Sequence, residues 1–174
     1  IGRNFNKFDA KKLAQDSVRK ATGLLNSKPV HSSSYAIVFN EEMMATLLKT
    51  FSGMFSAESI QEGKSILSGK LGEKIANNKV TIIDNALHPD GYATQAFDSE
   101  GYPSQKTILV EKGRLNSYLH NTETAKKDKV KSTGNGTRSY KDSLSVSPTN
   151  LYLEPNSNSV DELFKKHEET IEIV

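Results

Sequence analysis

The stretch AFDSEGYPSQKTILVEKGRL, residues 96–115, alternates short apolar runs with glycine-containing turns. Residues 98–101 have turn composition, because the aspartate can bond to its own backbone and Gly101 can take a positive φ. Residues 111–114, with the sequence EKGR, give a second turn signal. The strands that these turns would join lie at residues 92–97, 107–111 and 115–119. The stretch therefore predicts an antiparallel meander of three strands with tight connections.

The chain before this stretch is rich in helix signals. Asp9 can cap an N-terminal helix that runs to about residue 26. Residues 34–39 predict a short apolar strand that is buried on both faces. Asn40 can cap a second helix that continues to residue 55. Its apolar face is wide, so we expect deep burial against a sheet or another subunit.

The remaining elements are shorter. Ser56 can cap a helix over residues 56–62, and Gly63 can close it. Residues 131–148 are rich in Ser, Thr, Gly and Asn and show little periodicity, which predicts a long loop. Further strands are predicted at 79–84, 150–153 and 170–174, and further helices at 121–127 and 159–167. These elements predict an α+β fold, with a helix-rich segment over 1–78 and a β-rich segment over 79–174, both in one truncated region.

Composition narrows the class of protein. The 174 residues include no cysteine, which excludes disulfides, thiolate metal ligands and cysteine nucleophiles within this chain. No apolar run is long enough to span a membrane, and a cytoplasmic location fits the cysteine usage. The net charge is only +2 and the basic residues are scattered, so nothing favours direct nucleic-acid binding. The start at Ile1 and the final alternating run suggest a piece of a longer protein.

Asp98 and Glu100 are the first candidates for chemistry. In extended chain these two carboxylates would share a face, where they could hold a hard cation or share a proton. The neighbouring Gly101 and Pro103 instead favour a turn, and we adopt that interpretation.

A second candidate is the segment 132–138, with the sequence STGNGTR. Its backbone N–H groups could face an anion, with Arg138 nearby. The segment lacks the lysine-hydroxyl ending of a phosphate-binding loop, so we favour a mobile surface loop, with a peptide or ligand contact as the alternative.

Other catalytic patterns are missing from the sequence. His167 and Glu168 begin like a zinc-protease helix, but Ile171 stands where the second histidine of that pattern belongs. The four histidines show no ligand spacing: His31, His88, His120 and His167. No nucleophile elbow of the form Gly-x-Ser-x-Gly is present. The residues themselves therefore predict no catalytic centre and no metal ligands.

Several segments together resemble the PmbA/TldD family over nearly the whole chain. They are SGKLGEKI at 68–75, VTIID at 80–84, FDSEG at 97–101, EKGRL at 111–115, TA at 124–125 and STGN at 132–135. Each is weak alone, but their order and spacing are specific. The resemblance implies a subunit of a cytoplasmic zinc metalloprotease of two related chains that acts on unfolded peptides. Some family members are also linked to modulation of DNA gyrase inhibition.

The TldD type of chain in this family carries His-Glu-x-x-x-His on a helix after a buried strand, and the PmbA type, also called TldE, does not. When the strand at 36–39 and the turn at 68–69 are laid onto the TldD pattern without gaps, that motif falls on residues 48–53. Leu48 and Gly53 stand at the two histidine positions, and Lys49 stands at the glutamate position. None of the three can bind zinc or act as a base. The resemblance therefore implies a PmbA-type chain without cofactor, with zinc on a TldD-type partner.

The resulting expectation is a non-catalytic subunit that pairs with a TldD-type paralogue, or with itself, and contacts peptide substrate. Two alternatives stay open at this point: a stand-alone metallopeptidase, and a modulator that binds DNA gyrase without proteolysis. Because the motif is absent, enzymatic activity of this chain itself is left undecided. The candidate peptide-contact or family-landmark residues are Asp98, Glu100, Gly101, Thr133, Gly134 and Asn135.

Overall fold

The computed structural model describes residues 8–23, 25–26, 28–156, 159–165 and 170–173. Contacts divide the chain into two compact units, 1–36 and 37–174. Helix α1 (Ala10–Gly23) belongs to the first unit. The expected cap is confirmed, because Asp9 Oδ1 accepts a hydrogen bond from the Lys12 N–H at 2.9 Å. The division of the sequence near residue 78 stays a prediction.

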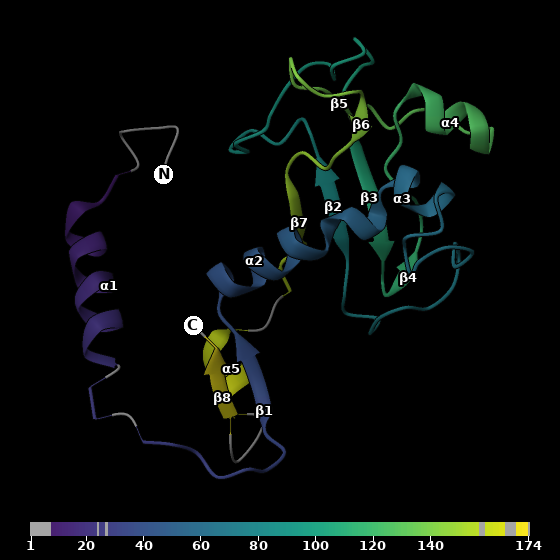
Figure 1. Ribbon diagram of the computed structural model, residues 1–174. Helices are drawn as coiled ribbons and strands as arrows, with labels where there is room; N and C mark the ends of the chain where they lie inside the picture. The colour runs from purple at the N-terminus through teal and green to yellow at the C-terminus, as the bar shows by residue number, and fades with distance from the viewer. Residues whose placement is uncertain (1–7, 24, 27, 157–158, 166–169, 174) are drawn as a thin grey trace. The chain divides into compact units, whose positions relative to one another are not determined.

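The second unit is built on a four-stranded antiparallel sheet in the order β4-β3-β2-β7 (Figure 1). Its strands are β2 (Ile82–Asn85), β3 (Lys106–Glu111), β4 (Arg114–Leu115) and β7 (Leu151–Leu153). Strand β2 lies in the middle and pairs with both β3 and β7. The mixed helix-and-sheet class predicted from the sequence is confirmed.

A tight turn joins β3 to β4, as the EKGR sequence predicts. Glu111 pairs with Arg114 across the turn. Lys112 has φ 47° and Gly113 has φ 80°. Two consecutive positive φ values match the twist of the flanking strands, which is why such two-residue hairpins are stable.

The predicted meander is wrong in its first strand, and its third strand, predicted at 115–119, is reduced to β4 because residues 116–118 form no strand. Residues 92–97 form no strand, and β2 takes their place beside β3. Phe97 makes an isolated bridge with Pro103, whose missing N–H prevents the pairing from extending into a ladder. The segment is held elsewhere, since the Ala93 N–H donates to Asn150 Oδ1 at 2.9 Å and the Gln95 N–H donates to the Ala86 carbonyl at 3.0 Å.

The other described helices and strands lie outside this sheet. The helices are α2 (Glu41–Phe51), the 3₁₀ helix η2 (Ser52–Phe55), α3 (Ala57–Gln61), α4 (Thr122–Asp128) and α5 (Val160–Lys165). Strand β1 (Ala36–Phe39) pairs with β8 (Thr170–Ile173), and β5 (Gly136–Thr137) pairs with β6 (Ser145–Val146). Figure 1 shows α3 near α4 and β6, with which it is in contact. The predicted loop over 131–148 is therefore interrupted by a short hairpin.

Local capping follows the sequence at two further predicted helix starts. Asn40 Oδ1 accepts from the Met43 N–H at 2.8 Å. Asn121 forms a reciprocal capping box with Thr124 at the start of α4. Ser56 occupies the predicted N-cap position of α3, but its side chain makes no capping bond. Residue 167, the predicted end of the last helix, lies outside the described residues.

The core includes residues of η2, α3 and the β3–β4 hairpin, and its buried members are Phe55, Ala57, Leu67, Leu109, Val110, Leu115, Tyr118 and Leu119. Deep burial of α2 is not observed, because each of its residues is exposed or half-buried. Phe51, at its end, is 55% exposed, and only the following 3₁₀ turn delivers Phe55 to the core. Strand β1 is not buried on both faces either, since Ile37 is 54% exposed. A two-stranded sheet covers too little surface to bury both faces.

Candidate functional site

The structure brings the two predicted candidate segments together. Asp98 Oδ2 accepts a hydrogen bond from the Gly136 N–H at 2.8 Å, and the Ser99 N–H donates to the Gly136 carbonyl at 3.0 Å. Asp98 Oδ1 accepts from the Glu100 and Tyr102 N–H groups, each at 2.9 Å. Asp98 is buried. The Asp98 carboxylate therefore stabilises the turn at 98–102 and joins that turn to the segment 132–138.

Glu100 connects the same turn to helix α4. Its Oε2 accepts from the Thr122 N–H at 2.7 Å, at the positive end of the helix. Gly101 has φ 78°, as the turn requires. No group of three or more His, Asp or Glu side chains suited to a metal ion exists among the described residues. The pair thus acts in the fold as a turn, and its role in peptide contact stays a prediction.

The anion-binding alternative for residues 132–138 does not fit the structure. The Thr133 and Asn135 N–H groups both donate to the His120 carbonyl, and the Gly134 N–H donates to Ser132 Oγ. The Gly136 N–H is held by Asp98 as described. These backbone donors are satisfied within the chain, so they form no open nest for a phosphate.

Asp84 is the centre of this region, and sequence reasoning did not single it out as a functional or structural site. It is 1% exposed and lies at the end of the apolar strand β2. Asn135 Nδ2 donates to its Oδ2, and the Thr149 N–H donates to its Oδ1, each at 2.7 Å. Burial raises the pKa of Asp84, and the hydrogen bonds from Asn135 and Thr149 oppose that shift. The signal in the sequence was a lone carboxylate closing a run of four apolar or β-branched residues.

The hydrogen bonds continue from Asp84 to His120. Asn135 Oδ1 accepts from Thr133 Oγ1 at 2.7 Å, and Thr133 Oγ1 accepts from the His120 N–H at 2.6 Å. His120 is 5% exposed, and its Nδ1 has no hydrogen-bond partner among the described residues. Burial lowers the pKa of His120 below the ordinary 6.5. Asp84, Asn135, Thr133 and His120 are called the polar junction below, together with Asp98.

The burial of His120 leads to a prediction for how the melting temperature depends on pH. Its pKa is lower in the folded than in the unfolded state, so its neutral form contributes stability above pH 6.5 that is lost as the pH falls below that value. We expect His120→Gln to reduce the fall of the melting temperature between about pH 7 and pH 5. Thermal unfolding at a series of pH values measures this, with the exposed His31→Gln as control. Equal slopes in both variants would contradict it.

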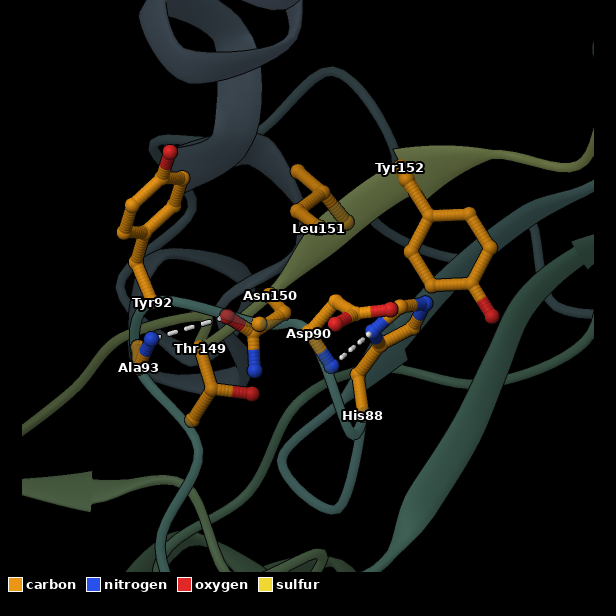
Figure 2. A pocket seen from close by; sticks show the side chains of 9 residues that line it. His88, Asp90, Tyr92, Ala93, Thr149, Asn150, Leu151 and Tyr152 are labelled. Atoms are coloured by element: carbon orange, nitrogen blue, oxygen red, sulfur yellow. Dashed lines mark hydrogen bonds between the residues drawn. The ribbon is translucent and has the colours of Figure 1, made fainter. Parts of the chain in front are cut away.

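A pocket of about 350 Å³ opens beside β7 (Figure 2). Its rim carries the aromatic rings of His88, Tyr92 and Tyr152 and the carboxylate of Asp90. The His88 and Tyr152 rings meet edge to face with their centroids 5.5 Å apart. Thr149 also lines the pocket, so one member of its wall donates directly to Asp84. The pocket can hold a side chain by aromatic contact and hydrogen bonding.

Hydrogen bonds between the Asn150 side chain and neighbouring backbone groups hold this pocket in shape. Asn150 Oδ1 accepts from the Ala93 N–H, as Figure 2 shows, and Asn150 Nδ2 donates to the Asn85 carbonyl at 2.9 Å. A Cβ on Gly91 would lie 2.5 Å from the Asn150 side chain. A larger residue at position 91 would therefore have to displace the Asn150 side chain from these hydrogen bonds.

A second, polar pocket of about 310 Å³ includes Thr133. Lys106 and Lys131 also line it. Of the six predicted contact residues, Thr133 is the one that reaches either of these two pockets, while Asp98, Gly134 and Asn135 are buried. The sequence did not indicate that Asp98 and Asn135, which are polar, would be buried.

Positions 48–53 lie on α2 and η2, in the part of the chain that the structure describes. Leu48 is half-buried, while Lys49 and Gly53 are exposed. Zinc needs imidazole, carboxylate or thiolate donors, and these residues offer an aliphatic side chain, an ammonium group and no side chain. The residues present therefore do not fit the family's zinc ion at this place. The His167–Glu168 pair lies outside the described residues.

Comparison with known proteins places the chain in a family. The model of the PmbA/TldA metallopeptidase C-terminal domain matches residues 32–174. A metalloprotease of Methanothermobacter thermautotrophicus is 38% identical over 158 residues, which cover 90% of this chain and 35% of that protein. A metalloprotease TldD homolog of Buchnera aphidicola is 32% identical over 157 residues, which cover 87% of this chain and 32% of that protein.

Solved structures agree with this assignment. A Thermotoga maritima protein described as a modulator of DNA gyrase superposes with a TM-score of 0.88 at 34% identity, covering 95% of this chain and 37% of that one. TldE from Thermococcus kodakarensis gives a TM-score of 0.85 at 25% identity, covering 95% of this chain and 38% of that one. The chain belongs to the PmbA/TldD family of metallopeptidases. It spans about a third of the length of these relatives, from 32% to 38%.

One further observation concerns membranes. Among the described residues, no helix combines the length and the apolar character that crossing a bilayer requires.

Proposed function

We propose that this chain is part of a PmbA/TldE-type subunit that carries no catalytic zinc and works with a TldD-type partner in the cytoplasm. One observation carries the proposal: Leu48, Lys49 and Gly53 stand where a TldD-type chain has its two histidines and its glutamate. The likeness to TldE supports the same assignment. The reaction would be hydrolysis of unfolded peptides, with zinc and the general base supplied by the partner.

The contribution of this chain would be to position the peptide. The pocket beside β7 supports this role, because its aromatic rim and fixed backbone suit side-chain contact without chemistry. The polar junction would hold the neighbouring loops in place. Self-association in place of a TldD-type partner is the competing assembly, and a stand-alone peptidase or a gyrase-binding modulator are the competing functions.

Zinc content tests the proposal. The full-length protein is purified alone and together with a TldD-type paralogue, and zinc per chain is measured along with hydrolysis of an unfolded peptide. About one zinc ion per pair, and hydrolysis only in the mixture, is the expected result. Stoichiometric zinc and hydrolysis in the protein alone would contradict it. Binding to gyrase without peptidase activity in either sample would favour the modulator.

A single substitution sharpens this test. Lys49→Ala is expected to leave hydrolysis by the pair within about twofold of the unaltered pair, because an exposed ammonium group off the reaction path contributes little. The matched change is glutamine for the glutamate of the His-Glu-x-x-x-His motif in the partner, which is expected to reduce kcat by at least about a hundredfold. Loss of activity in Lys49→Ala with normal pairing would assign this helix to the catalytic centre.

A further inference from the structure

The polar junction contains a chemically labile pair of residues. Asn135–Gly136 is the only Asn–Gly dipeptide in the 174-residue sequence. Because glycine has no side chain, its backbone nitrogen can reach the preceding asparagine side chain more easily than that of any other residue. In flexible peptides this dipeptide loses its amide spontaneously. No oxidant or enzyme is needed, and water is the only co-reactant.

The fold holds each group that this reaction would use. The leaving nitrogen, Asn135 Nδ2, donates to Asp84 Oδ2 at 2.7 Å and to the Ser147 carbonyl at 3.1 Å. The attacking nitrogen, that of Gly136, is fixed by its bond to Asp98 Oδ2 at 2.8 Å. Asn135 itself is 3% exposed. The leaving nitrogen and the attacking nitrogen are therefore each held by a different aspartate.

We propose that Asn135–Gly136 is a latent deamidation site that Asp84 and Asp98 keep silent and that reacts when the polar junction opens. In the reaction the Gly136 nitrogen bonds to Asn135 Cγ and loses its proton. The Cγ–Nδ2 bond breaks, and ammonia leaves with that proton. Water then opens the cyclic imide, which leaves a carboxylate at position 135 in an aspartyl or isoaspartyl linkage.

The product prevents the junction from closing again. A carboxylate at position 135 would replace the donor that faces Asp84 Oδ2 across 2.7 Å, and both groups are buried. Two buried carboxylates in contact cannot both be ionised without a large cost. A transient opening of this region would thereby cause a permanent loss of the native arrangement. The fraction of chains with a converted residue 135 would increase with each opening.

Trypsin gives a direct measurement in the full-length protein. Lys131 and Arg138 flank the site, so digestion releases residues 132–138 as STGNGTR. The amide-to-acid mass change is followed in this peptide after incubation of the native protein, and in the free synthetic peptide. Loss in the native protein is expected to be at least on the order of a hundredfold slower, because only the opened fraction reacts. Equal rates would overturn the proposal.

Asp98→Asn tests the role of the carboxylate that holds Gly136. The substituted amide can present a donor to the Gly136 N–H, so we expect faster conversion of Asn135 in protein that remains folded by circular dichroism. Asp142→Asn is the matched control, since both aspartates precede serine and Asp142 is exposed. Conversion in folded Asp98→Asn that is no faster than in the control would overturn the proposal.

Two further measurements apply if Asp98→Asn does not fold. In the unaltered protein, conversion is expected to rise with urea below the unfolding midpoint, in proportion to the opened fraction. Asn135→Asp is expected to lower the melting temperature more at neutral than at acidic pH. Asn135→Ala adds no charge, so its lowering of the melting temperature should depend less on pH. A urea-independent rate, or matching pH profiles for the two variants, would count against the mechanism.

Discussion

Gly113→Ala is expected to lower the free energy of unfolding by about 2–4 kcal/mol. A Cβ at this position would lie 2.4 Å from the Ala76 carbonyl oxygen and 2.6 Å from that of Asn77. These are backbone atoms, so they cannot rotate away. The residue also has φ 80°, a conformation that costs an L side chain about 1 kcal/mol before any contact is counted.

The neighbouring hydrogen bonds give a local measurement of this effect. The Ile75 and Ala76 N–H groups donate to the Gly113 carbonyl at 2.9 and 3.1 Å. Faster hydrogen exchange at these two amides should accompany the lower melting temperature. Gly101→Ala is the control, because Gly101 has φ 78° but open space where the Cβ would stand. It should lose only about 1 kcal/mol, and equal losses would show that the carbonyl contacts do not matter.

Asp84→Ala is expected to destabilise the fold by about 2–4 kcal/mol at neutral pH. The change leaves the Thr149 N–H without its acceptor and removes one of the two acceptors of Asn135 Nδ2. It also leaves a small cavity where a side chain that is 1% exposed had been. Urea unfolding of the full-length protein measures the loss, with the exposed Asp128→Ala as a control expected to stay within about 0.5 kcal/mol.

The pH dependence of this variant distinguishes the effect of ionising the Asp84 carboxyl group from the effect of removing its side chain. Burial raises the pKa of Asp84 above 3.8, so ionisation costs the unaltered protein stability as the pH rises from 3.8 through the folded pKa. The deficit of Asp84→Ala should therefore be larger in acid than at neutral pH. A deficit that grows with rising pH would mean that the ionised carboxylate is net stabilising where it lies.

The sequence predicted the elements whose signals are local. Asn40 and Asn121 cap their helices because the capping side chain and the N–H that it binds are three residues apart. The Lys112–Gly113 turn is likewise fixed by the conformations of two adjacent residues. The family, too, was predicted from short segments in a fixed order. The same local reasoning failed for residues 92–97, whose backbone partners include Asn150, far along the chain.

Burial was the other property that the sequence did not predict. Apolar periodicity in α2 and β1 indicated deep burial, yet burial depends on which element covers which face, and these elements remain partly exposed. In the opposite direction, polar residues expected on a mobile loop are enclosed. Asn135 is buried because Asp84 offers an acceptor 51 positions away in sequence. A hydrogen bond between residues so far apart produces no pattern in the sequence around either of them.

By itself, then, the sequence determined the helix starts, the tight β3–β4 turn, the α+β class and the absence of zinc ligands at positions 48–53. Those properties depend on residue type and near neighbours. Only the tertiary structure decided that β2 pairs with β3, that Asp98 holds Gly136, and that Asp84 and His120 are buried in one hydrogen-bonded region. These arrangements arise when distant segments satisfy one another's polar groups as they leave water, and that pairing is a property of the whole fold.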